Sequence, residues 1–148
     1  MNYILPPYLF VLFALMMTFY SYANSPTLYI SLPYSGVGFF VLIFGIAIAA
    51  KGKRYFAENN SNIHTFGQPN KLVTTGMFNY SRNPMYLGFV IALLGVCILN
   101  GLAIEHLAMQ FLFILIVRYW YIAFEEKIML ETFGSDYQHY CMQVRRWI

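Results

Sequence analysis

The hydrophobic residues of this chain gather into four long stretches. They cover residues 4–23, 34–50, 84–99 and 102–124. A helix that crosses a bilayer needs about 20 apolar residues, with a range of about 17 to 25. The first and fourth stretches meet this length, whereas the second and third need residues at the membrane interface to complete them. The pattern predicts four transmembrane helices.

Turn signals divide the rest of the chain. Asn100-Gly101 separates the third stretch from the fourth and predicts a tight helical hairpin. In the polar tail, Phe133-Gly134 predicts the end of a helix, with Gly134 in a left-handed cap conformation. Residues 135–138 read as a capping box that opens another helix. One face of that helix carries Tyr137, Tyr140, Cys141 and Val144. We expect this face to lie against the membrane or the bundle.

The basic residues fall on one side of the predicted spans. Residues 24–33 carry no charge, and only Glu105 follows the turn near Asn100. The segments before the third stretch and after the fourth contain Lys51, Lys53, Arg54, Lys71, Arg82, Lys127, Arg145 and Arg146. Because cytosolic loops are enriched in Lys and Arg, both termini, the central segment 51–83 and the tail 125–148 are predicted to be cytosolic.

Composition narrows the class of protein. Hydrophobic residues make up 59% of the chain and charged residues 10%, whereas a soluble domain has about 25% charged residues. The net charge of +3 and the lack of a long basic run argue against nucleic-acid binding. The two cysteines lie in different kinds of segment and the three histidines are scattered, so neither a disulfide framework nor a metal site is predicted. Glu105 and His106 are expected to cap the hairpin.

Gly36-Val37-Gly38 lies inside an apolar stretch and follows no predicted strand. Close packing between helices therefore explains these glycines better than a dinucleotide-binding loop. The chain is predicted to be a single all-α integral membrane domain of 148 residues. We expect this domain to have four transmembrane helices and cytosolic C-terminal helices, and to lack a Rossmann domain.

Arg82-Asn83-Pro84 opens the third stretch. Asn is a favoured N-cap residue, Pro is favoured at the first helical position, and Arg marks the cytosolic interface, so a structural role suffices. The functional alternative uses the same geometry. A helix N-terminus carries a partial positive charge and presents N–H groups, and Arg82 beside it makes a seat for a carboxylate.

Glu125-Glu126 follows the fourth stretch. The two carboxylates are either solvated at a helix end or used to bind hydroxyl groups or a cation. Consecutive helical residues point about 100° apart, so the two carboxylates should not face the same partner equally.

Arg118 lies within the fourth stretch. An arginine at this depth costs several kcal/mol unless it pairs or extends to the interface. It therefore either snorkels to the membrane surface or faces a polar cavity that holds an anionic substrate group.

Residues 72–88 read Leu-Val-Thr-Thr-Gly-Met-Phe-Asn-Tyr-Ser-Arg-Asn-Pro-Met-Tyr-Leu-Gly. Together with Glu125-Glu126, residues 133–137 and the terminal Arg-Arg-Trp-Ile, this segment resembles the isoprenylcysteine carboxyl methyltransferase family. That family belongs to a group of membrane methyltransferases that includes phospholipid N-methyltransferases. The resemblance covers roughly the C-terminal half of the chain, from about His64 onward.

The resemblance implies that S-adenosylmethionine (SAM) binds at the cytosolic face. Carried over position by position, the cofactor-binding residues are Asn70, Lys71, Leu72, Val73, Gly76, Phe78, Asn83, Pro84, Met85, Tyr86, Glu125 and Glu126. Arg82 and Arg118 are the candidate catalytic residues, one for an anionic group at the helix start and one for the substrate.

Three positions depart from the prenylcysteine enzymes. Those enzymes have His at the position of Asn83 and Tyr at that of Phe78, although bacterial relatives often read Arg-Asn-Pro-Met-Tyr. They also carry a substrate-binding Arg at the position of Tyr121. Arg118, one turn earlier on roughly the same face, is the candidate to replace it. The methyl acceptor therefore stays open among lipophilic carboxylates, thiols and amines.

These features lead to the hypothesis of a SAM-dependent methyltransferase in a bacterial or archaeal cell membrane rather than the endoplasmic reticulum. Its expected partners are membrane lipids and a lipophilic or lipid-linked substrate. The alternatives are a small four-helix transporter and a non-catalytic membrane subunit. A proton-coupled transporter usually places a carboxylate deep in a helix, whereas the first three stretches contain no Asp, Glu, Lys, Arg or His.

Overall fold

The computed structural model describes residues 5–31, 33–58 and 69–148, and this part of the chain is helical without a strand. The α-helices are α1 (Pro6–Asn24), α2 (Val37–Glu58), α3 (Pro84–Leu99), α4 (Ile104–Ile116) and α5 (Ala123–Gln143). Two short 3-10 segments are η1 (Tyr34–Gly36) and η2 (Gly76–Asn79), and a π-helical segment, η3 (Val117–Ile122), joins α4 to α5. The predicted all-α class is confirmed.

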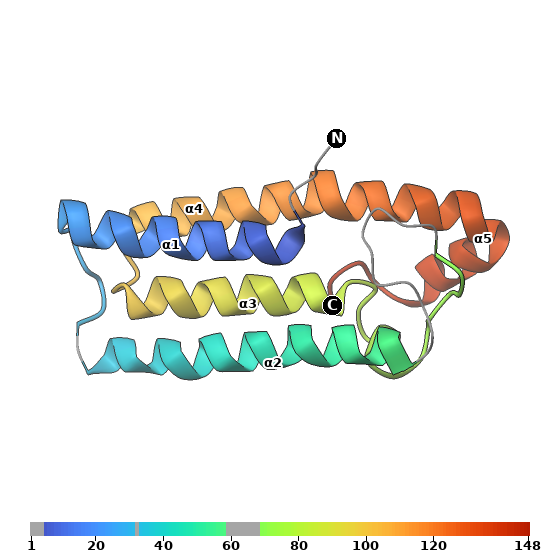
Figure 1. Ribbon diagram of the computed structural model, residues 1–148, viewed down its shortest axis with the longest axis horizontal. Coiled ribbons are helices and arrows are strands. Elements are labelled where there is room, and N and C mark those ends of the chain that lie inside the picture. Colours follow the sequence, from blue (N-terminus) through green and yellow to red (C-terminus); the bar gives the residue numbers. More distant parts are fainter. Residues whose placement is uncertain (1–4, 32, 59–68) are drawn as a thin grey trace.

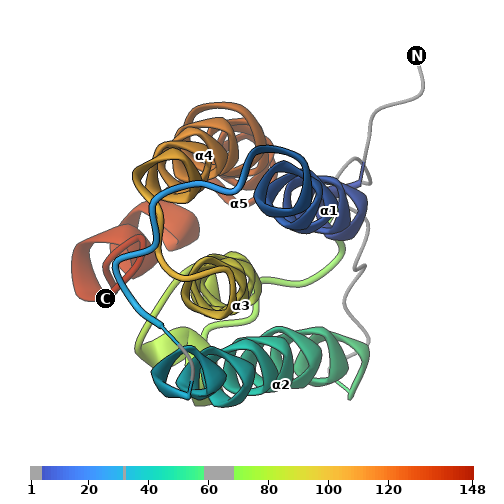
Figure 2. The same cartoon turned by 90° about the vertical axis from the view of Figure 1, so that its left-hand side faces the viewer.

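Among the described residues, three helices are long and apolar enough to cross a membrane: Pro6–Asn24, Tyr34–Glu58 and the continuous run Ile104–Gln143. The fourth apolar helix, α3, has 16 residues and is about 24 Å long at 1.5 Å per residue. Figure 2 shows α3 in the centre, with α1, α2 and α4 around it. A helix that is apolar all round is buried by its neighbours, so the central position of α3 follows from its sequence.

The helices run in alternating directions, as Figure 1 shows. At one end of the bundle the two connections meet, because the backbone amides of Tyr29 and Ile30 donate to the Gly101 carbonyl at 2.9 and 3.1 Å. The beginnings of α1 and α3, the end of α2 and the C-terminus lie toward the other end. The basic residues before α3 and after η3 are therefore gathered at one end.

Helices α2 and α3 are in backbone contact. A Cβ atom on Gly45 would collide with the backbone nitrogen of Ala92, and one on Gly95 with that of Leu42. Small residues allow such close approach between helices in membranes. The packing role predicted for the Gly36-Val37-Gly38 pair holds for Gly38, where a Cβ would come within 2.5 Å of the Gly95 carbonyl oxygen. It is wrong for Gly36, which has open space around it.

The predicted hairpin is present. The Gly101 amide donates to the Ile98 carbonyl, and the Leu102 amide to that of Cys97, which is the hydrogen-bond pattern of a Schellman cap. Gly101 and Leu102 both have positive φ, at 77° and 55°. Because these two residues belong to the turn, the next helix begins at Ile104 and not at the predicted residue 102.

Helix α2 continues to Glu58, past its predicted end at residue 50. Its polar end carries an i,i+4 ion pair between Arg54 and Glu58 at 2.7 Å, which stabilises helical turns. The apolar pattern marks the membrane-spanning part of a helix and not its full length. The predicted start of the first span at residue 4 and residues 59–68 of the central segment lie outside the described residues.

Helix α5 is interrupted at Gly134, as predicted. Its φ of 51° is positive, but its ψ of −119° lies outside the left-handed helical region, so the expected left-handed cap is wrong in detail. The face with Tyr137, Tyr140 and Val144 is buried against Val73 and Phe78. It therefore packs on the segment before α3, within the bundle.

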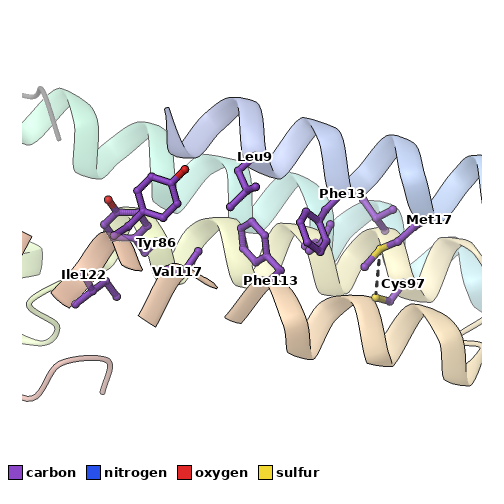
Figure 3. Close-up of a cluster of buried hydrophobic side chains, with 11 residues drawn as sticks. Leu9, Phe13, Met17, Tyr86, Cys97, Phe113, Val117 and Ile122 are labelled. Carbon is purple, nitrogen blue, oxygen red and sulfur yellow. Dashed lines mark hydrogen bonds between the residues drawn. The ribbon is translucent and has the colours of Figure 1, made fainter. Parts of the chain in front are cut away.

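One hydrophobic core joins α1, α3, α4 and η3. Figure 3 shows its labelled members, from Leu9, Phe13 and Met17 through Tyr86, Cys97 and Phe113 to Val117 and Ile122. The core includes Tyr86, the third residue of α3, whose hydroxyl group contacts one of the polar residues described next.

Candidate site at the start of α3

Asn83 occupies the N-cap position of α3, but its side chain makes no capping hydrogen bond. Its Nδ2 donates instead to the backbone carbonyl of Arg146 at 3.0 Å, and its own amide donates to Ser81 Oγ at 3.2 Å. The predicted capping role of Asn83 is therefore wrong, because its side-chain amide is bound to the C-terminal tail. Within the described parts of the chain, no side chain caps the start of α3.

Arg82 turns toward α5. Its Nη1 lies 3.3 Å from Glu126 Oε1 and donates to Tyr137 Oη at 3.5 Å and to Cys141 Sγ. Its Nε is buried and has no hydrogen-bond partner among the described residues. The anion beside Arg82 in this structure is thus a protein carboxylate.

Glu126 is held by two arginines. Arg146 donates to it through Nε at 3.0 Å and Nη2 at 2.6 Å, a two-point contact with both carboxylate oxygens. The hydrogen bond with Glu126 raises the pKa of Arg146 above its ordinary value. Only 18% of the Glu126 side chain is exposed. Such charge-assisted, two-point bonds are stronger than neutral ones.

Glu125 points elsewhere. It accepts a hydrogen bond from Tyr86 Oη at 2.6 Å. Tyr86 is 3% exposed, and its ring lies 6.3 Å from that of Tyr121. The prediction that the adjacent carboxylates face different partners is confirmed. The end of the fourth span and the start of the third meet through this bond.

The segment before α3 carries the other cofactor-binding candidates. Val73 and Phe78 are buried, and Leu72 is partly buried, in the cluster beneath α5. Tyr140 Oη donates to the Phe78 carbonyl at 2.7 Å, which ties the segment to α5. Gly76 has a φ of 64°, and a Cβ there would meet the Tyr55 ring.

The candidates at the two ends of that segment differ in exposure. Asn70 and Lys71 are exposed, whereas Pro84 is buried and Met85 partly buried. Met85 lies against Gly52 of α2, because a Cβ on Gly52 would meet its Cγ at 2.6 Å. The cofactor-binding candidates therefore lie on the segment before α3, the start of α3 and the start of α5.

Arg118 does not join this group. Its side chain is exposed and lies 5.5 Å from the ring of its neighbour Tyr119, whereas Tyr121 is buried. The expected shared face was wrong because it assumed α-helical spacing. Residues 117–122 are π-helical, and i→i+5 bonding places more residues in each turn, which rotates Arg118 away from Tyr121.

His106 does not cap the hairpin. It is fully buried, and its Nε2 lies 3.0 Å from Ser21 Oγ and 3.1 Å from the Met17 carbonyl. It joins α4 to α1 at the end of the bundle opposite Glu125. Arg146 and Tyr137 were also missed as neighbours of the candidate site. The terminal Arg-Arg pair, part of the family resemblance, was the signal available for Arg146.

The family model described as phospholipid methyltransferase matches residues 34–136. The chain belongs to the phospholipid methyltransferase family. The matched range includes Asn83, Glu125 and Glu126 but neither α1 nor Arg146. No curated protein and no solved structure matches the chain. The resemblance to membrane methyltransferases is confirmed, and the family indicates a methyltransferase.

Proposed function

We propose that this family member transfers a methyl group from SAM to a lipophilic acceptor at the cytosolic face of the membrane. The observation that carries the proposal is the meeting of the uncapped start of α3 with the Glu125 carboxylate through Tyr86. A helix start attracts anions and a carboxylate attracts hydroxyl or ammonium groups. SAM contains all three kinds of group.

The residues present fit this cofactor. The start of α3 suits its carboxylate, and the buried Nε of Arg82, which has no partner within the described ranges, is a further donor beside it. Glu125 suits the ribose hydroxyls or the amino group. Bound SAM supplies a methyl group already activated on a sulfonium. The chain therefore mainly aligns donor and acceptor.

The orientation and the acceptor are parts of the same proposal. The Lys and Arg residues gathered at the end of the bundle with the C-terminus favour a cytosolic location for both termini and for the site. A cell membrane of a bacterium or archaeon is the proposed location. Because Arg118 is exposed, it does not replace the substrate arginine that is missing at the position of Tyr121. The proposed acceptor is a lipophilic carboxylate, thiol or amine, and Arg118 is not assigned to bind it.

Titration of the detergent-purified protein with S-adenosylhomocysteine tests the proposal. The wild type is expected to bind, and Glu125→Ala to bind about ten- to a hundredfold more weakly, since a hydrogen bond to a charged group contributes about 1.5–3 kcal/mol. Glu131→Ala is the matched control, because Glu131 lies on the same helix and its side chain is 65% exposed. Absence of binding to the wild type at millimolar ligand contradicts the proposed function. Equal affinities for both variants contradict the assignment of Glu125.

A further inference from the structure

The last five residues, Val144–Ile148, follow α5 and return to the start of α3, where Figure 1 places the C-terminus. Three hydrogen bonds end on backbone carbonyls of this tail. The Arg82 amide donates to Arg145 at 3.1 Å, and Asn83 Nδ2 and Ser81 Oγ donate to Arg146 at 3.0 and 3.5 Å. The tail therefore binds the residues that precede α3.

Side chains connect the same tail to α5. Arg146 holds both oxygens of Glu126, and Arg82 lies 3.3 Å from one of them. The three side chains are 33%, 18% and 13% exposed, respectively for Arg146, Glu126 and Arg82. Partial burial reduces solvent screening, so the ion pair between Arg146 and Glu126 should be stronger than a fully exposed one. Its geometry fixes the tail relative to Glu126.

The two adjacent carboxylates therefore have separate partners. Glu125 meets Tyr86, inside the proposed cofactor site, whereas Glu126 is occupied by arginines. Because one helix carries both carboxylates, a contact that fixes Glu126 also fixes where Glu125 lies. The Arg146 carbonyl, through Asn83, fixes where α3 begins. A single residue thus connects the two halves of the site.

We propose that Arg146 is a positioning residue, and that it holds the start of α3 and Glu125 at the separation that a bound cofactor requires. Glu126 is then the anchor of this contact and not a cofactor ligand. The inference rests on the proposed function for the identity of the ligand. The contacts of Arg146 with Glu126 and Asn83 do not depend on that function.

The test compares S-adenosylhomocysteine affinities of Arg146→Met, Glu126→Gln and the double variant. Arg146→Met leaves Glu126 paired with Arg82, so no carboxylate is left without a cation and the fold should persist. Its affinity is expected to fall about tenfold, within the usual range for coupling between two groups of a protein. Arg146→Lys keeps the charge without the two-point contact and should fall between Arg146→Met and the wild type.

The double variant separates an anchor from a ligand. If Glu126 acts through Arg146, the double variant binds no more weakly than Glu126→Gln alone, because both changes break one link. If Glu126 touches the cofactor, Glu126→Gln lowers the affinity of the Arg146→Met variant by the same factor by which it lowers the affinity of the wild type. That result overturns the proposal. Arg145→Met is the matched control, since the Arg145 side chain is exposed and the variant keeps the backbone carbonyl that accepts from the Arg82 amide.

Hydrogen exchange of the ligand-free protein provides a readout that needs no cofactor. The Arg82 amide is bonded to the Arg145 carbonyl, so Arg146→Met should speed exchange across residues 81–87 while Arg145→Met leaves it unchanged. Equal exchange in the two variants overturns the positioning role. If the wild type does not bind S-adenosylhomocysteine, the proposed function fails, and the exchange measurement still decides whether Arg146 holds the start of α3.

Discussion

The polar residues around the two ends of α3 differ in charge and in exposure to solvent. At its start lie the charged side chains of Arg82, Glu126 and Arg146, all partly exposed. Toward its other end lie the side chains of His106 and Gln110, both buried near Cys97. The charged side chains at the start of α3 therefore keep contact with solvent, whereas His106 and Gln110 are buried.

His106 and Gln110 join helices to one another. His106 reaches Ser21 and the Met17 carbonyl on α1, and Gln110 Nε2 donates to the Val90 carbonyl on α3 at 3.0 Å. Interhelical hydrogen bonds of this kind hold membrane bundles together. At the charged end, the start of α3 keeps no side-chain cap. Polar groups at one end join α4 to α1 and α3, and those at the other join the start of α3 to the C-terminal tail and the tail to α5.

Replacing His106 tests the first half of this comparison and should have the largest effect. His106→Leu keeps much of the volume but removes the contacts with Ser21 and Met17, at a cost of about 2 kcal/mol. A lower melting temperature in detergent is expected, with unchanged affinity for S-adenosylhomocysteine below the transition. A loss of affinity beyond about twofold would show that the two ends are coupled.

Tyr86→Phe tests the second half. The change removes the hydroxyl that donates to Glu125 and leaves the ring in the core. The affinity for S-adenosylhomocysteine is expected to fall about fivefold, because the carboxylate loses its orienting partner at a cost near 1 kcal/mol. Calorimetric titration measures it, and Tyr80→Phe, at an exposed tyrosine, is the control. An unchanged affinity would remove Tyr86 from the site.

Gln110→Leu should act like His106→Leu but more weakly. Its amide makes one hydrogen bond to a backbone carbonyl of α3, and such bonds average about 0.6 kcal/mol in membranes. A small fall in melting temperature is expected. If this fall exceeded that of His106→Leu, the assignment of His106 as the principal tether would be wrong.

Arg118→Met should have the smallest effect. Because Arg118 is exposed on η3 and turned away from Tyr121, its loss is expected to change S-adenosylhomocysteine affinity by less than about twofold. Titration beside the wild type checks this. A larger loss would give Arg118 a role in cofactor binding, which neither the sequence nor the structure assigns to it.

Several features could be predicted from sequence because they depend on neighbours along the chain. The apolar stretches located the helices, and Gly101 and Gly134 located two breaks. The predicted end of α2 was too early because charged residues continue that helix. The predicted start of α4 was too early because Gly101 and Leu102 have positive φ angles and belong to the turn. The π-helical turn was also missed, since the residue pattern of η3 does not differ from that of an α-helix.

The sequence by itself determined the membrane class, the alternating helices and the motif residues around Asn83 and Glu125. Each of these follows from local hydrophobicity, turn chemistry or residue identity. Only the tertiary structure decided which carboxylate meets Tyr86 and which is held by Arg146. That choice depends on how the tail folds back across 20 residues to α5 and 63 residues to α3. Side-chain partners at such separations are set by packing in space, which no local periodicity encodes.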